Sequence, residues 1–163
     1  MKLIVDEILP GAPDDVLDAF TDAGFLTSLH ELEKIGAPEV LGQQREEGVV
    51  RQQVRYRFVG ELSPLVTAAI DRAKLVWVDE HVYDLAGHRA TFTITPEHYG
   101  ERFDCHGREQ FLAVAEGTAW HVEADVKVRW PVVGGLVEKA IASGLRDTLA
   151  AEVSLVARWL DGR

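Results

Sequence analysis

Glu152 is the residue whose chemical type fits its position least. Around it, segment 136–160 carries apolar or small side chains at helical spacing, at Val137, Ile141, Leu145, Thr148, Val156 and Trp159. At about 100° per residue, Glu152 falls near the middle of this stripe. An unpaired buried carboxylate costs several kcal/mol, so Glu152 must be paired, protonated or directed at water. It is a candidate for binding a ligand hydroxyl or amine, or for acid/base catalysis. The alternative is a structural carboxylate paired with an arginine or with a tryptophan or tyrosine donor.

Glu109 is a second carboxyl on the more apolar side of its segment. In strand phase it shares a face with Phe103, Cys105 and Phe111. If this face points inward, two carboxyls enter the same interior, which suits general acid/base chemistry. The alternative is that Glu109 lies near a strand end or beyond a bulge and reaches solvent.

Segment 74–85 has two alternating faces, one of which is aromatic and polar. That face consists of Trp77, Asp79, His81 and Tyr83, and the other is mostly valine. A two-residue turn at Ala86-Gly87 would place His81 opposite Phe92, on the inner side of the sheet. We favour this register over the one that places these four side chains in water.

The sequence lacks the motifs of a metal, phosphate or cysteine site. No H-x-x-x-H or H-E-x-x-H spacing occurs among the histidines. Cys105, the only cysteine, is interpreted as a small core residue, because its neighbour His106 points to the opposite face of a strand. Gly134-Gly135 lacks the Lys and Ser/Thr of a phosphate loop and is interpreted as close packing of a helix start. We predict no metal and no cofactor.

The overall composition excludes several partner classes. The chain has 163 residues, 47% of them hydrophobic, and a formal net charge of −10. That charge disfavours nucleic acid, where binding depends on phosphate neutralisation. No apolar run reaches the roughly 20 residues that span a bilayer, and the first residues do not form a signal peptide. We expect one cytoplasmic domain.

The periodicity predicts a strand, two short helices, six strands and a long helix. The strands are predicted at 2–9, 40–47, 49–59, 74–85, 89–96, 102–115 and 118–130, and the helices at 13–22, 25–36 and from Val137 to Leu160. Consecutive strands with short turns indicate an antiparallel meander. Its apolar face needs a cover, and only the terminal helix is long enough. Segment 62–70, which begins with the helix-start signal Ser63-Pro64, is predicted to be a lid or entrance, or else a plug at one end of the sheet.

The junction before the last helix supports a family resemblance. It reads Trp-Pro-Val-Val-Gly-Gly-Leu-Val-Glu over residues 130–138. Near its end the helix carries an acidic residue, Glu152, then a spacer and Arg158-Trp159-Leu160. These features and the element order resemble the START-like superfamily, also called Bet v 1-like or SRPBCC, and within it an uncharacterised bacterial family. The resemblance implies a single α+β domain over 1–163 with the helix-grip fold. In that fold a curved seven-stranded antiparallel sheet surrounds the C-terminal helix and encloses a mostly apolar cavity.

The superfamily contains lipid carriers, polyketide cyclases, hormone receptors, chaperone activators and Rieske domains, and this chain lacks the Cys/His pairs of a Rieske cluster. We expect a protein that binds or transports a hydrophobic small molecule such as a lipid, polyketide or isoprenoid, in a cavity of roughly 300–1,000 Å³. The predicted ligand-binding residues are Trp77, His81, Tyr83, Phe92, Phe111, Trp120, Leu145, Thr148 and Glu152.

Two other functions remain open. One is a cyclase or dehydratase that uses Glu152, Glu109 or His81 to move protons, although no triad or dyad motif commits the chain to catalysis. The other is a regulatory module that contacts an unknown protein partner through the sheet exterior or the lid segment.

Overall fold

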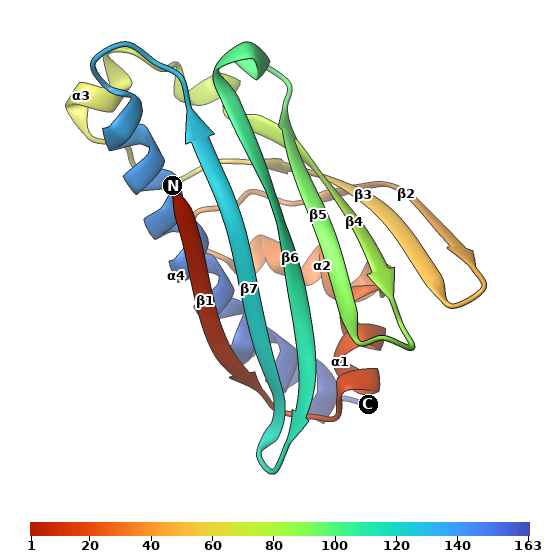
Figure 1. Ribbon diagram of the computed structural model, residues 1–163. Coiled ribbons are helices and arrows are strands. Elements are labelled where there is room, and N and C mark those ends of the chain that lie inside the picture. The colour runs from red at the N-terminus through yellow and green to blue at the C-terminus, as the bar shows by residue number, and fades with distance from the viewer.

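The computed structural model describes residues 1–163 and contains one seven-stranded antiparallel sheet and one long helix (Figure 1). The strands are β1 (Lys2–Leu9), β2 (Glu39–Glu46), β3 (Val49–Arg57), β4 (Val76–Asp84), β5 (Arg89–Pro96), β6 (Phe103–Val114) and β7 (Gly117–Val128). The helices are α1 (Pro13–Phe20), α2 (Ala23–Ser28), α3 (Pro64–Thr67) and α4 (Gly134–Asp161), with 3₁₀ turns at Leu29–Glu31, Arg72–Lys74 and Gly100–Arg102. This confirms the predicted α+β order.

The sheet is a meander that β1 completes at one edge. The strand order is β1-β7-β6-β5-β4-β3-β2, and every neighbouring pair is antiparallel. Helices α1, α2 and α4 lie on the same side of the sheet, with α4 running behind β1 and β7 (Figure 1). The interior therefore lies between the inner face of the sheet and these helices. Because every strand belongs to one sheet, we propose that residues 1–163 form one domain. No helix is both long enough and apolar enough to cross a membrane.

The second helix is shorter than predicted. We expected it to reach residue 36, but α2 ends at Ser28 and continues only as a 3₁₀ turn to Glu31. Beyond it Leu32 is extended and Ile35 forms an isolated β-bridge with Phe58, so pairing with the sheet replaces further helical turns. Phe25 is nonetheless fully buried, as the predicted apolar face requires.

The turns agree with their sequence signals, with strand ends shifted by one or two residues. Glu47 and Gly48 both have positive φ, 50° and 78°, as a tight two-residue hairpin turn requires. At the start of α4, a Cβ on Gly134 would lie 2.9 Å from the carbonyl oxygen of Val128. The predicted close packing is confirmed for Gly134, whereas Gly135 faces open space.

Segment 62–70 packs at the N-terminal end of α4. The Ser63 hydroxyl accepts a hydrogen bond from the Val66 amide, which confirms the predicted helix start. Val66 and Ile70 form a small second core with Val133 and Val137. None of these residues lines the interior cavity described below. Of the two interpretations of this segment, the structure supports the plug rather than the lid.

Candidate functional site

A cavity of about 110 Å³ lies between the inner face of the sheet, the α2 region and α4. It is lined by 23 residues, of which 17 are hydrophobic. The volume is smaller than the predicted range because aromatic side chains fill the interior. The Phe20 ring, for example, lies 5.7 Å from the Phe25 ring and 5.2 Å from the Trp120 ring. The expected size was therefore wrong, although a mainly apolar cavity exists between the sheet and α4.

The β4–β5 hairpin turns the polar and aromatic face of β4 into this cavity. His81 pairs with Phe92 and Asp79 pairs with Ile94, as the predicted two-residue turn requires. Trp77 and Tyr83 lie in the same phase and also line the cavity. The favoured register is thus confirmed, because one residue of slip would have directed all four side chains outward.

His81 lies between two carboxylates. Its Nδ1 is 2.8 Å from Asp79 Oδ1, and its Nε2 is 3.2 Å from Glu109 Oε1. The Trp120 indole Nε1–H donates to the other Glu109 oxygen at 3.3 Å. The β6–β7 ladder is continuous through the Glu109–Val122 pair, so no bulge turns Glu109 outward. The alternative in which Glu109 reaches solvent is therefore wrong, and Glu109 is the one charged residue among the buried side chains.

The carboxylates hold His81 as an imidazolium. Burial alone lowers the pKa of His81, but the charges of Asp79 and Glu109 and the hydrogen bond to Glu109 outweigh it and raise the pKa well above its usual range. Near neutral pH His81 is thus a proton donor rather than a general base. Its ring also stacks on Tyr83 and Phe92, with centroids 5.2 Å and 5.3 Å apart, which fixes the orientation of the imidazole.

Glu152 reaches the cavity from α4 and has no hydrogen-bond or ion-pair partner in the protein. The alternative in which Glu152 is a structural carboxylate paired with an arginine, tryptophan or tyrosine donor is therefore wrong. Arg158, on the same helix, pairs with Glu31 instead. Burial, with the nearby charges of Glu109 and Asp79, raises the pKa of Glu152 to about 8, although His81 acts in the opposite direction. At neutral pH most Glu152 side chains are protonated, so this residue can donate or accept a proton.

Eight of the nine predicted ligand-binding residues line the cavity. These are Trp77, His81, Tyr83, Phe92, Trp120, Leu145, Thr148 and Glu152. Phe111 does not, because its fully buried ring lies behind Phe20 and Trp120, at 5.8 Å and 6.3 Å from their rings. That the eight contact a ligand stays a prediction.

Tyr56 and Gln52 also line the cavity and were not among the predicted ligand-binding residues. Their signal was the alternation in segment 49–59, where they share the inward phase of Val50 and Val54. Burial, then the charges of Asp79 and the other cavity carboxyls, raises the pKa of Tyr56 well above its usual range, so it stays a neutral phenol.

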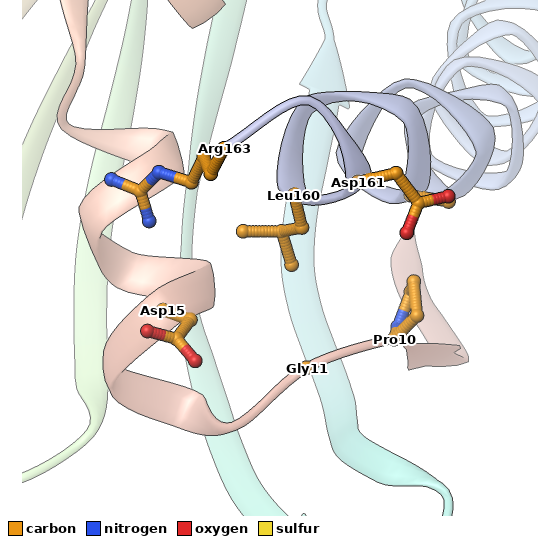
Figure 2. Close-up of a pocket in the computed structure, with 7 residues that line it drawn as sticks. Pro10, Gly11, Asp15, Leu160, Asp161 and Arg163 are labelled. Carbon is orange, nitrogen blue, oxygen red and sulfur yellow. The ribbon is translucent and has the colours of Figure 1, made fainter.

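A larger depression, of about 570 Å³, lies outside this interior, where the β1–α1 loop meets the end of α4 (Figure 2). Only seven residues line it, among them Asp15, Leu160, Asp161 and Arg163. Figure 2 shows the charged side chains spread around Leu160 rather than converging on one point. With two hydrophobic residues in its lining, it offers a ligand little desolvation. We therefore place the candidate site in the smaller interior cavity.

The fold matches solved structures over nearly the whole chain. The protein TTHA0849 from Thermus thermophilus is 21% identical, with a TM-score of 0.71, and the match covers 97% of this chain and 98% of that one. The ZhuI aromatase/cyclase from Streptomyces sp. R1128 is 12% identical, with a TM-score of 0.67 and coverages of 96% and 90%. Norcoclaurine synthase from Thalictrum flavum is 12% identical, with a TM-score of 0.66 and coverages of 100% and 87%.

These similarities show the helix-grip fold that the sequence indicated. A sequence search of curated proteins gives no significant match. Residues 6–160 match a single family across almost their entire length, and the chain belongs to that family, described as "Protein of unknown function (DUF2505)".

Proposed function

We propose that this protein binds a small, mainly hydrophobic molecule in the cavity between the sheet and α4. The observation that carries the proposal is the lining itself, in which 17 of 23 residues are hydrophobic and a few polar groups converge from β4, β6 and α4. Small-molecule sites combine apolar walls with a small number of placed polar groups in this way.

The energetics of the interior support an occupant. At the roughly 24 cal/mol per Å³ measured for engineered cavities, an empty space of about 110 Å³ costs on the order of 3 kcal/mol. The unpartnered Glu152 carboxyl adds a desolvation cost that a ligand donor would relieve. A ligand with an apolar body and one polar end offsets both costs at once.

A larger ligand requires the 26–35 segment to move outward. Leu26, Leu29 and Ile35 from this segment line the cavity. Two surface ion pairs join the segment to α4, Lys34–Asp147 at 2.9 Å and Glu31–Arg158 at 2.5 Å. Exposed pairs of this kind contribute little free energy, so they do not hold the segment closed against a ligand. Entry between this segment and α4 is part of the proposal.

Mass spectrometry of the purified protein tests the proposal, first under native conditions and then after organic extraction. We expect one hydrophobic compound at defined stoichiometry. A ligand-free protein that shows no thermal shift with any member of a lipid, polyketide and single-ring aromatic panel would overturn the proposal.

An acid/base enzyme of the cyclase or dehydratase type is the second candidate. The observation that favours it is the pair of proton-bearing groups on opposite walls, the His81 imidazolium and Glu152, whose pKa of about 8 lies near neutrality. The solved structures named aromatase/cyclase and norcoclaurine synthase support it by fold alone. If the extracted compound turns over, Glu152→Gln should abolish turnover while the protein still binds the compound. Glu80 is exposed on the outer face of β4, so the control variant Glu80→Gln should change neither turnover nor binding.

A further inference from the structure

We infer that the ligand of this cavity carries a cationic nitrogen, and that the cavity rejects carboxylates and phosphates of similar size. This inference rests on the proposed function, since it requires that the cavity binds a small molecule. It adds the chemical class of the ligand, which neither the family description nor the fold supplies.

The ionisable groups that line the cavity are mainly acidic. Three carboxyl groups, those of Asp79, Glu109 and Glu152, line the cavity with one imidazole, that of His81, and no lysine or arginine. With Glu152 mostly protonated near neutral pH, the imidazolium offsets one of the other two carboxylates, which still leaves a surplus of negative charge. A buried surplus charge is costly, and a ligand anion would increase it. A ligand cation would instead provide the missing partner.

Two walls of the cavity present carboxyl groups that lack a full set of hydrogen bonds. Glu152 projects from α4 with no partner. On β4, Asp79 Oδ1 is buried and its only close partner is His81 Nδ1, at 2.8 Å, in a contact that lacks hydrogen-bond alignment. Buried acceptors without donors are rare in folded proteins and call for a specific explanation. An ammonium group, with up to three N–H donors, can supply the donor that either carboxyl lacks.

Aromatic side chains line the cavity together with these carboxyls. Tyr56 and Trp77 stack with centroids 5.9 Å apart and an interplanar angle of 24°, and both line the cavity. The face of an aromatic ring attracts a cation, most strongly where water is excluded. Aromatic rings next to carboxylates therefore favour an amine over a neutral or anionic group of the same shape.

The volume sets the size of the ligand that fits without movement of the 26–35 segment. An apolar cavity of about 150 Å³ is known to hold benzene. The cavity of about 110 Å³ is smaller, so it suits a short amine as it stands, and a single-ring amine requires the 26–35 segment to move outward. Because the pKa of free Glu152 is raised to about 8, binding of an amine at neutral pH should also release a proton as Glu152 ionises.

The test compares three probes that share one ring and differ in charge: benzylamine, benzyl alcohol and benzoate. Calorimetry on the full chain near pH 7 should give benzylamine an affinity about tenfold or more above that of benzyl alcohol, with benzoate weakest. Repeating the titration in two buffers of different ionisation enthalpy should detect the released proton. Glu152→Gln should lower benzylamine affinity about tenfold and leave benzyl alcohol unchanged, whereas Glu80→Gln should alter neither.

The outcomes separate this inference from the proposed function. If benzyl alcohol or benzoate binds as tightly as benzylamine, the cation inference is wrong while ligand binding stands. If benzylamine binds best but Glu152→Gln does not weaken it, the assignment of the carboxyl as its partner is wrong. If none of the three binds and no compound co-purifies, both proposals fail.

Discussion

The protein contains the same three-residue arrangement twice, once on each face of its sheet. On the inner face, His81 lies between Asp79 and Glu109, at 2.8 Å and 3.2 Å. On the outer face, His121 lies between Asp6 and Glu123, at 2.5 Å and 3.2 Å. Each arrangement also has a fourth member that donates to the glutamate: Trp120 to Glu109 on the inner face, and Arg108 to Glu123 on the outer face.

Burial separates the two arrangements. The inner side chains are 15%, 17% and 5% exposed, in the order His81, Asp79 and Glu109. The outer ones are 31%, 72% and 21% exposed, in the order His121, Asp6 and Glu123, so the largest difference is between the two aspartates. For His121, hydrogen bonds to Asp6 and Glu123 raise the pKa and burial opposes them only weakly. For His81, burial is the largest single influence on the pKa and lowers it, but the two carboxylates together outweigh burial and raise the pKa. The same residue types thus form a surface cluster with little desolvation cost on the outer face, and a cluster with strong electrostatic coupling in the interior.

Replacing His81 should give the largest effect. His81→Gln leaves Asp79 and Glu109 in the interior without a positive partner, and removal of one member of a buried ion pair costs about 3–5 kcal/mol. We expect a loss of that size in the free energy of unfolding, measured by urea denaturation near pH 7.

The matched control is His121→Gln. Its carboxylate partners stay hydrated when the imidazole is lost, so the urea midpoint should barely move. Equal losses in the two variants would show that burial does not distinguish the two arrangements.

Replacing Glu152 should produce a pH-dependent gain in stability. The pKa of Glu152 is about 8 in the folded protein and near 4.5 when unfolded, so between these values the unfolded chain loses the proton first. Wild-type stability should therefore fall as pH rises from about 4.5 to 8. Glu152→Gln lacks this dependence and should gain on the wild type across the window, by at most about 5 kcal/mol. Urea denaturation at several pH values measures the difference, and parallel curves for the two proteins would contradict it.

Replacing Trp120 or Arg108, the fourth members of the two arrangements, should change the free energy of unfolding less, and the size of the change should depend on the face of the sheet. Trp120→Phe removes the indole donor from Glu109 and part of a buried ring, which should cost about 1–3 kcal/mol by urea denaturation. Arg108→Gln on the outer face should leave the midpoint nearly unchanged, because Arg108 is 66% exposed and Glu123 keeps His121 as a partner. A larger loss in the arginine variant would reverse the comparison.

The sequence predicted the inner arrangement better than the outer one. Period-2 alternation and one hairpin turn were sufficient to place His81 opposite Phe92 and direct Asp79 inward. The outer arrangement depends on the pairing of β1 with β7, which brings Asp6 beside His121 from the other end of the chain, and no local pattern contains that pairing. Cavity volume was beyond the sequence for a similar reason, since it depends on how Phe20, Phe25 and Trp120 share one space.

Added salt should separate the two histidines without any mutation, and this is the smallest effect that we predict. The Debye length falls from about 10 Å at 0.1 M salt to about 3 Å at 1 M, so ions can screen His121 from Asp6 and Glu123. The pKa of His121, raised mainly by its hydrogen bond to Asp6, should move downward with salt. That of His81 should hold, because the protein keeps ions away from Asp79 and Glu109. Imidazole NMR signals followed through a pH titration at both salt concentrations measure each site. A His81 signal that titrates in the ordinary range, or that shifts with salt as much as His121 does, would mean that the inner arrangement is hydrated and that its carboxylates are free to meet water rather than a ligand.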